Sequence, residues 1–214
     1  MTTPESGSQQ PQARSEESPE LERRTAGSVL DDVAIRRALM RIAHEIVEGH
    51  ESLQDVYLVA IPNGGVPLGR ILARNLEDLT GVRVPLGLLD TTLYRDDVLV
   101  TAERPPLRVT EMPSSVDDRV VLLVEDVVST GRTIRAAMDG LMDFGRPRAV
   151  QVVALVDRGH RELPIKIDYV GKNIPTQPSD RVRLIADSLG QEPMEVVLEG
   201  LVGEGPAPLQ EGSQ

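Results

Sequence analysis

The order of hydrophobic and polar positions predicts buried strands that alternate with amphipathic helices. Nearly continuous apolar runs, which are typical of strands buried on both faces, occupy residues 56–61, 120–124 and 149–156, and a further strand is expected at 82–88. Apolar residues spaced three to four apart predict helices at about 31–48, at 66–79 and from 134 onward. Residues 182–186 and 194–198 predict a final strand pair. This alternation favours an α/β fold with a central, mainly parallel sheet flanked by helices.

The two ends of the chain lack this pattern. Residues 1–28 are rich in Ser, Glu, Gln, Pro and Thr, so a disordered extension is expected there. Residues 202–214 are expected to form a flexible tail, which leaves one domain over residues 29–201. The sequence holds no hydrophobic signal segment and no apolar stretch of membrane length, and we expect a cytoplasmic protein with no membrane partner.

The most informative stretch begins where the apolar run 120–124 ends. Glu125 and Asp126 come first, and then the segment Val127-Val128-Ser129-Thr130-Gly131-Arg132-Thr133 leads into a helix. A strand that ends in such a loop and opens a helix directs backbone N–H groups and the positive end of the helix dipole at one point, which suits a phosphate monoester. Carboxylates accept hydrogen bonds from the two vicinal hydroxyls of a ribose. The stretch therefore indicates a ribose 5-phosphate site.

Simpler interpretations of this stretch explain less. Helix capping would account for Ser129 or Thr130, but it would not account for two adjacent acids at the end of a buried strand, where desolvation is costly. Neither a Walker loop nor a GxGxxG dinucleotide motif is present. The adjacent glycines of Pro62-Asn63-Gly64-Gly65 allow close approach of a ligand or a tight turn, and the residues alone leave that choice open.

The stretch 120–137 resembles the phosphoribosyl pyrophosphate (PRPP) motif of type I phosphoribosyltransferases. Residues 89–97, 156–164 and 171–176 narrow the resemblance to the PyrR family, whose members are pyrimidine operon regulators that also act as uracil phosphoribosyltransferases. The similarity covers about residues 33–201. It implies a type I phosphoribosyltransferase fold with a mobile lid loop, expected between residues 91 and 118, and a small base-binding hood, expected at 157–176.

The resemblance also implies roles for individual residues. Glu125 and Asp126 would bind the ribose, and Arg95 on the lid would stabilise the charge of the pyrophosphate. Asp157 and Ile174 would lie at the base. PRPP and UMP would be bound by Asn63, Gly64, Gly65, Val127, Val128, Ser129, Thr130, Gly131, Arg132 and Thr133. Relatives usually carry a basic residue and then Thr-Arg-Gly here, whereas this chain has Pro62, Asn63 and Gly64. Because this change removes positive charge at the leaving group, weakened catalysis is one expectation.

A regulator of this family would also bind RNA. The residues at the matching positions are Arg41, His44, His160, Arg161, Lys166 and Lys172. Solubility is the alternative explanation for such basic residues. The formal net charge of −11 argues against indiscriminate binding to nucleic acid, so an RNA site would have to be a local basic patch.

Three functions remain open on the sequence alone. The first is a bifunctional protein that makes UMP from uracil and PRPP and binds a pyrimidine operon mRNA leader in response to UMP or UTP. The second is an RNA-binding nucleotide sensor with little or no catalysis, and the third is a phosphoribosyltransferase for another base. Mg²⁺ would arrive bound to PRPP, with no dedicated metal site in the protein. A homodimer or higher homo-oligomer is expected from the resemblance.

Overall fold

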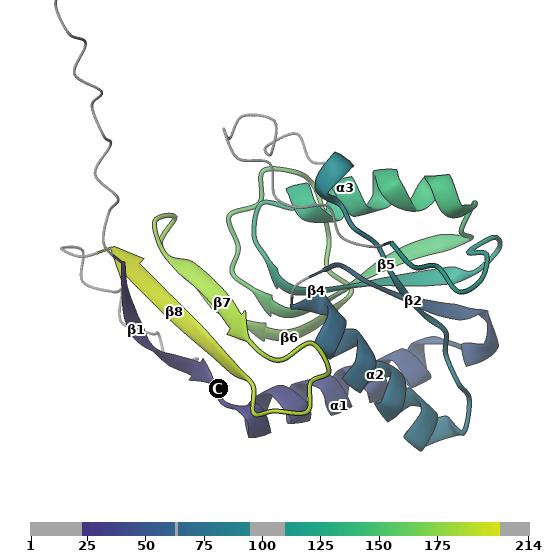
Figure 1. Ribbon diagram of the computed structural model, residues 1–214, viewed down its shortest axis with the longest axis horizontal. Coiled ribbons are helices and arrows are strands. Elements are labelled where there is room, and N and C mark those ends of the chain that lie inside the picture. Colours follow the sequence, from purple (N-terminus) through teal and green to yellow (C-terminus); the bar gives the residue numbers. More distant parts are fainter. Residues whose placement is uncertain (1–22, 63, 95–109, 202–214) are drawn as a thin grey trace, which may run out of the picture.

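A computed structural model of the chain describes residues 23–62, 64–94 and 110–201. A five-stranded parallel sheet in the spatial order β3-β2-β4-β5-β6 forms its centre (Figure 1). The strands are β2 (Val56–Ala60), β3 (Leu86–Leu88), β4 (Val120–Val128), β5 (Ala149–Asp157) and β6 (Tyr169–Asn173). The predicted α/β architecture with a mainly parallel sheet is confirmed.

Helices cover both faces of this sheet. Helices α1 (Asp32–Gly49) and α2 (Gly65–Thr80) lie on one face, and α3 (Arg132–Leu141) lies on the other (Figure 1). Short 3₁₀ helices occur at η1 (Leu53–Asp55), η2 (Thr92–Tyr94) and η4 (Met142–Phe144). The predicted start of α1 is confirmed, because the side chain of Asp31 accepts a 2.8 Å hydrogen bond from the N–H of Ala34. In the described ranges, no helix has the length and hydrophobicity needed to cross a membrane.

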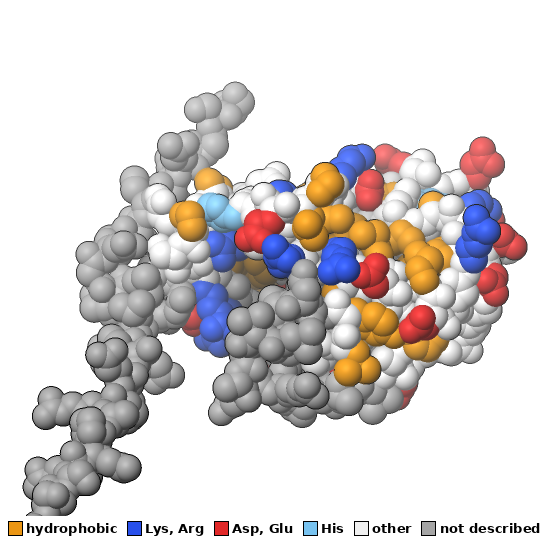
Figure 2. Space-filling view, turned by 90° about the horizontal axis from the view of Figure 1, so that it is seen from above, with side chains coloured by type: hydrophobic (Ala, Val, Ile, Leu, Met, Phe, Trp, Pro, Cys, Tyr) orange, Lys and Arg blue, Asp and Glu red, His pale blue; other side chains and the backbone are white. Residues whose placement is uncertain are grey.

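Hydrophobic side chains are exposed on the side of the molecule that carries α3. Leu93 of η2 is 75% exposed, and Met142 and Phe144 of η4 are 51% and 37% exposed. Figure 2, which looks onto this side, shows hydrophobic side chains mixed with basic and acidic ones. Exposed apolar groups of this kind suit contact with another protein.

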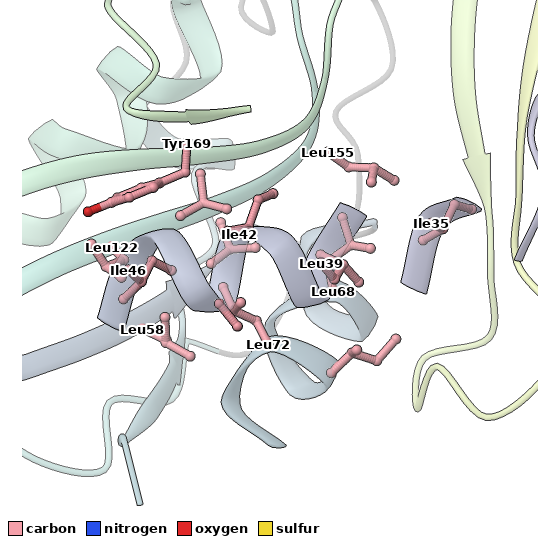
Figure 3. Packing of buried hydrophobic residues seen from close by; sticks show 14 of the residues in the cluster. Ile35, Leu39, Ile42, Ile46, Leu58, Leu68, Leu72, Leu122, Leu155 and Tyr169 are labelled. Carbon is pink, nitrogen blue, oxygen red and sulfur yellow. The ribbon is translucent and has the colours of Figure 1, made fainter. Parts of the chain in front are cut away.

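The alternating side chains of the strands form two cores, one on each face of the sheet. On the face of α1 and α2, Leu122 and Leu155 pack into a cluster with side chains from both helices (Figure 3). On the other face, Leu123 packs in a cluster with Ile134 of α3. Each residue from Val120 to Val124 is at most 7% exposed, which explains the unbroken apolar run in the sequence.

A second, smaller sheet lies beside the central one. It consists of β1 (Arg23–Leu30), β7 (Arg181–Ile185) and β8 (Glu195–Leu201) in the order β1-β8-β7, and both pairs are antiparallel (Figure 1). The predicted final strand pair is therefore confirmed as β7 and β8. Strand β7 contacts β4, so this sheet stands against the carboxyl-end region of the central sheet.

The structure corrects several predicted boundaries. The sequence predicts a disordered extension up to residue 28, whereas β1 begins at Arg23. The polar sequence of β1 does not by itself predict a strand. The strand forms because it pairs with β8 from the other end of the domain. The strand predicted at 82–88 begins only at Leu86, immediately after Pro85, which has no N–H to donate. Residues 1–22 and 202–214 lie outside the described part of the chain.

The hood also differs from the prediction. Residues 157–176 do not form a separate hood, because Tyr169–Asn173 is strand β6, the edge of the central sheet. The structure that stands over the strand ends is instead the β1-β8-β7 sheet, which is built from both ends of the domain. Much of the expected lid, residues 95–109, lies outside the described ranges, so the lid stays a prediction.

Candidate active site

Three loops meet at the carboxyl ends of neighbouring strands. They come after β2, β4 and β5, which are adjacent in the sheet, and this edge is where open parallel sheets bind ligands. A cavity of about 670 Å³ lies here, between this edge and the β1-β8-β7 sheet. Its lining residues are Gly64, Asp126, Val127, Ser129, Arg158, Arg181, Val182, Arg183, Leu184, Ala186, Asp187 and Ser188. The cavity has the size of a typical small-molecule site.

The loop after β4, residues 129–131, is the candidate phosphate loop of this site and is called the phosphate loop below. It is shorter than predicted, because Val127 and Val128 belong to β4 and pair with β5. Val128 is 3% exposed and part of the core, so only the backbone near it can serve a ligand. Gly131 has φ +90°, a left-handed conformation that favours glycine. This turn lets α3 begin at once after the strand.

The start of α3 is open toward a ligand. Its N-cap residue, Gly131, provides no side chain to cap the first N–H groups of the helix. The amide of Arg132 donates weakly to the hydroxyl of Thr130, at 3.3 Å. Ser129, Thr130 and Thr133 are all partly exposed. The predicted phosphate-binding residues are therefore brought together at a helix N-terminus, where the dipole favours an anion.

The acidic pair is divided between two environments. Asp126 lines the cavity, whereas Glu125 is only 9% exposed and does not line it. Burial raises the pKa of the Asp126 carboxyl above its ordinary range, and hydrogen bonds from the backbone amides of Val127 and of Asp126 itself oppose this shift. Of the two acids, Asp126 is therefore the one that faces the cavity, and its predicted role at the ribose stays a prediction.

The glycines after β2 are needed for close packing. A Cβ atom at Gly64 would overlap the carboxylate of Asp126, and one at Gly65 would overlap the carbonyl oxygen of Val124. The loop backbone thus lies directly against the end of β4, which supports close approach over a simple turn. Asn63 and Arg95, which the sequence analysis also singled out, lie outside the described residues.

The structure does not bring Asp157 and Ile174 into the cavity. The carbonyl oxygen of Asp157 accepts a 2.9 Å hydrogen bond from the N–H of Ile174, so these two backbone groups bind each other. The Ile174 side chain is 2% exposed and belongs to the main core. The apolar lining of the cavity comes instead from Val127, Val182, Leu184 and Ala186.

Sequence reasoning missed the basic wall of the cavity. Arg158, at the end of β5, and Arg181 and Arg183, on β7, all line it. Arg183 is paired with Glu199, and Arg158 donates to Thr176 and Gln177. The side chain of Arg181 is exposed and has no hydrogen bond or ion pair within the described part of the chain. The Arg-Val-Arg alternation at 181–183 is the signal that places both arginines on one face of a strand.

The six predicted RNA-binding residues fall into two groups. Arg41, His160 and Arg161 make internal contacts: Arg41 donates to the carbonyls of Val170 and Gly171, His160 contacts Thr176, and Arg161 donates one hydrogen bond to the carbonyl of Ser129 in the phosphate loop. Within the described residues, the side chains of His44, Lys166 and Lys172 make no such contact apart from the ion pair of Lys166 with Asp168. Arg41 and His160 are exposed, as these three are. Arg41 lies beside Lys172 at the edge strand β6, and His44 comes one helical turn later. The structure thus gathers Arg41, His44 and Lys172 at one edge of the sheet.

Comparisons with known proteins agree with this geometry. The family model for the phosphoribosyl transferase domain matches residues 25–183. Among curated proteins, "Bifunctional protein PyrR" of Pelotomaculum thermopropionicum is 49% identical over 176 residues, which cover 82% of this chain and 97% of the relative. The protein of the same name from Deinococcus radiodurans is 50% identical, over 73% of this chain and 86% of the relative.

Solved structures give the same fold. A hypoxanthine phosphoribosyltransferase of Trypanosoma cruzi superposes with a TM-score of 0.62 at 21% identity, over 81% of this chain and 91% of that structure. The fold and the match place the chain in the phosphoribosyltransferase domain family. Within that class, the chain belongs to the PyrR family.

Proposed function

We propose that the chain is a bifunctional regulator of pyrimidine biosynthesis. It transfers the phosphoribosyl group of PRPP to uracil, which gives UMP and pyrophosphate, and it binds pyrimidine operon mRNA in response to uridine nucleotides. The observation that carries the proposal is the phosphate loop at the N-terminus of α3 beside Asp126 in one cavity, in a chain about half identical to proteins named PyrR. The name of those relatives supports both activities.

The chemistry requires positioning and charge compensation. The bond from C1 of the ribose to the pyrophosphate oxygen breaks, the bond from C1 to N1 of uracil forms, and the proton of N1 leaves. Positive charge grows on the sugar and negative charge on the leaving group. The phosphate loop would hold the 5-phosphate, and Asp126, with Glu125 behind it, would hold the ribose hydroxyls.

The pyrophosphate would lie between the glycine loop and the basic wall. The described residues of the loop, Pro62, Gly64 and Gly65, carry no positive charge. Two arginines across the cavity, Arg158 and Arg181, carry it instead. Arg95 of the lid stays the further candidate. Charge on these residues favours departure of the anionic leaving group.

Mg²⁺ would enter with PRPP. The carboxylate oxygens of Asp126 are ligands that Mg²⁺ accepts, but no group of three acids or histidines comes together among the described residues. Oxygen atoms of the ribose and of the pyrophosphate would therefore supply most of the ligands. The ion would add positive charge at the leaving group.

RNA binding would use the edge of the sheet. Arg41, His44 and Lys172 lie there, and Lys166 is exposed on the connection from β5 to β6. The carbonyl groups that Arg41 satisfies belong to an edge strand, so protection of that edge is the alternative role of Arg41. Against the net charge of −11, such a local patch would give selective and salt-dependent binding.

The second candidate is a nucleotide sensor that binds RNA with little catalysis. The observation in its favour is the glycine loop, whose described residues lack a positive charge.

For the assembly, we propose a homodimer or higher homo-oligomer, which the exposed side chains of Leu93, Met142 and Phe144 support. A monomer at all concentrations in sedimentation would count against this assembly.

One assay separates these functions. Uracil, hypoxanthine and guanine are each incubated with PRPP, Mg²⁺ and the full chain, and nucleotide formation is measured. We expect UMP to form and the purine bases to react far more slowly. No UMP together with UMP-dependent binding to the chain's own pyrimidine operon leader would favour the sensor, and faster reaction with a purine base would overturn the choice of base.

A further inference from the structure

A second segment supports the phosphate loop from behind. Residues 158–168, called the bracing segment here, connect β5 to β6. The amides of Glu162 and Leu163 donate to the carbonyl oxygen of Thr130, at 3.0 and 3.1 Å. A Cβ at Gly131 would lie 2.9 Å from Cγ1 of Ile165, so the two segments are in close contact. The bracing segment therefore fixes the backbone of the phosphate loop.

Arg161 is the centre of this support. Its Nη1 donates to the carbonyl oxygen of Ser129 at 2.6 Å, and its Nη2 donates to Oδ2 of Asp157 at 2.8 Å. Its Nε donates to the carbonyl oxygen of Ile165 at 3.1 Å. The side chains of Arg161 and Asp157 are only 24% and 21% exposed. The planar guanidinium thus joins the phosphate loop, the end of β5 and the bracing segment.

These contacts set the direction of the donor groups. In a trans peptide the C=O and the following N–H point in opposite directions. Because Arg161 holds the carbonyl of Ser129, the N–H of Thr130 points away from the bracing segment. The amides of Glu162 and Leu163 hold the carbonyl of Thr130, so the N–H of Gly131 also points away. Donors fixed in this way bind an anion without reorganisation.

We propose that Arg161 is a positioning residue for the 5-phosphate and not primarily an RNA contact. It aligns the phosphate loop. It also transmits the effect of phosphate binding to the bracing segment, which carries Lys166. This inference rests on the proposed function, because it takes the phosphate of PRPP or UMP as the ligand of the loop. It gives a physical route from the nucleotide site to the exposed basic residues.

The test compares Arg161→Ala and Arg161→Lys with a control, Arg148→Ala. The side chain of Arg148 is exposed and, among the described residues, pairs only with Asp55 at the opposite end of the sheet, so its loss removes the same charge without touching the loop. For Arg161→Ala we expect the KM for PRPP to rise roughly tenfold or more, because charge-assisted hydrogen bonds to the loop are lost. The KM for uracil should change little. Arg161→Lys should lie between, because an ammonium cannot bridge the same three acceptors.

Hydrogen exchange provides a readout that does not depend on catalysis. UMP should slow exchange at the amides of Glu162 and Leu163 in the wild-type chain, and Arg161→Ala should speed their exchange without ligand and weaken the effect of UMP. If the wild-type chain forms no UMP, the catalytic function fails, but exchange without ligand still tests Arg161. An unchanged KM for PRPP in active protein, or unchanged exchange at both amides, would overturn the proposal.

Discussion

The two walls of the cavity are built in opposite ways. One wall is local in sequence, because Asp126, Val127 and Ser129 lie close together along the chain at the end of β4. The other, Arg181 to Ser188 on and after β7, is held by β8, which pairs with β1 from the far end of the domain. The local wall presents backbone donors and a carboxylate, and the remote wall presents arginines and apolar groups. We infer that the local wall binds the ribose 5-phosphate, which the substrates of phosphoribosyltransferases have in common. The remote wall would then affect the binding of the groups next to the ribose 5-phosphate.

The largest effect is expected on the local wall. Asp126→Asn with Glu125→Gln should reduce UMP formation by about 100-fold or more, because hydrogen bonds to a charged acceptor are lost at the ribose. The measurement is a steady-state rate, and the single variants separate the two acids. Asp126→Asn should cost more than Glu125→Gln, since only Asp126 lines the cavity. Unchanged activity in the double variant would remove the ribose assignment.

The stability of the Asp126→Asn variant should not fall as its activity does. Burial raises the pKa of Asp126, so the folded chain keeps this proton at a pH where the unfolded chain has lost it. The free energy of unfolding therefore falls as pH rises from the ordinary aspartate range through the raised pKa. At neutral pH, Asp126→Asn should melt at the same temperature as the wild-type chain or higher. A clear drop in melting temperature would show that the carboxylate is structural.

A smaller effect is expected on the remote wall. Arg181→Ala should raise the KM for PRPP by about three- to fivefold at low salt. The effect should be smaller at high salt, because salt screens the attraction between an exposed arginine and the anionic ligand. Arg183→Ala is the matched control: Arg183 is neutralised by Glu199, whose side chain is 13% exposed, so its loss should lower stability more than it changes the KM. If the KM for PRPP of Arg181→Ala equals that of the wild-type chain at every salt concentration, the remote wall does not contact the pyrophosphate.

The sequence could predict what short-range pattern determines. The apolar run of β4, the cap at Asp31 and the loop at 129–131 can be identified because each depends on neighbouring residues. Strand β1 escapes prediction because its pairing partner lies at the other end of the domain. Strand β6 escapes it because Gly171-Lys172-Asn173 is polar, as an edge strand allows.

The direction of long side chains was also beyond the sequence. Arg161 and Lys166 lie in the same bracing segment and look alike as basic residues. The structure separates them: Arg161 donates three hydrogen bonds inward, whereas the Lys166 side chain is 85% exposed. A list of basic residues cannot distinguish a side chain that positions a loop from one that is available to RNA.

The most direct test of the central claim, that the loop after β4 binds a 5-phosphate, is an equilibrium titration of the wild-type chain with UMP and with uridine. The two ligands differ only in the phosphate. We expect UMP to bind on the order of 100-fold more tightly, because the loop amides and the start of α3 make charge-assisted hydrogen bonds to the phosphate. Equal affinities for UMP and uridine, or no binding of UMP, would show that the loop after β4 does not bind a 5-phosphate.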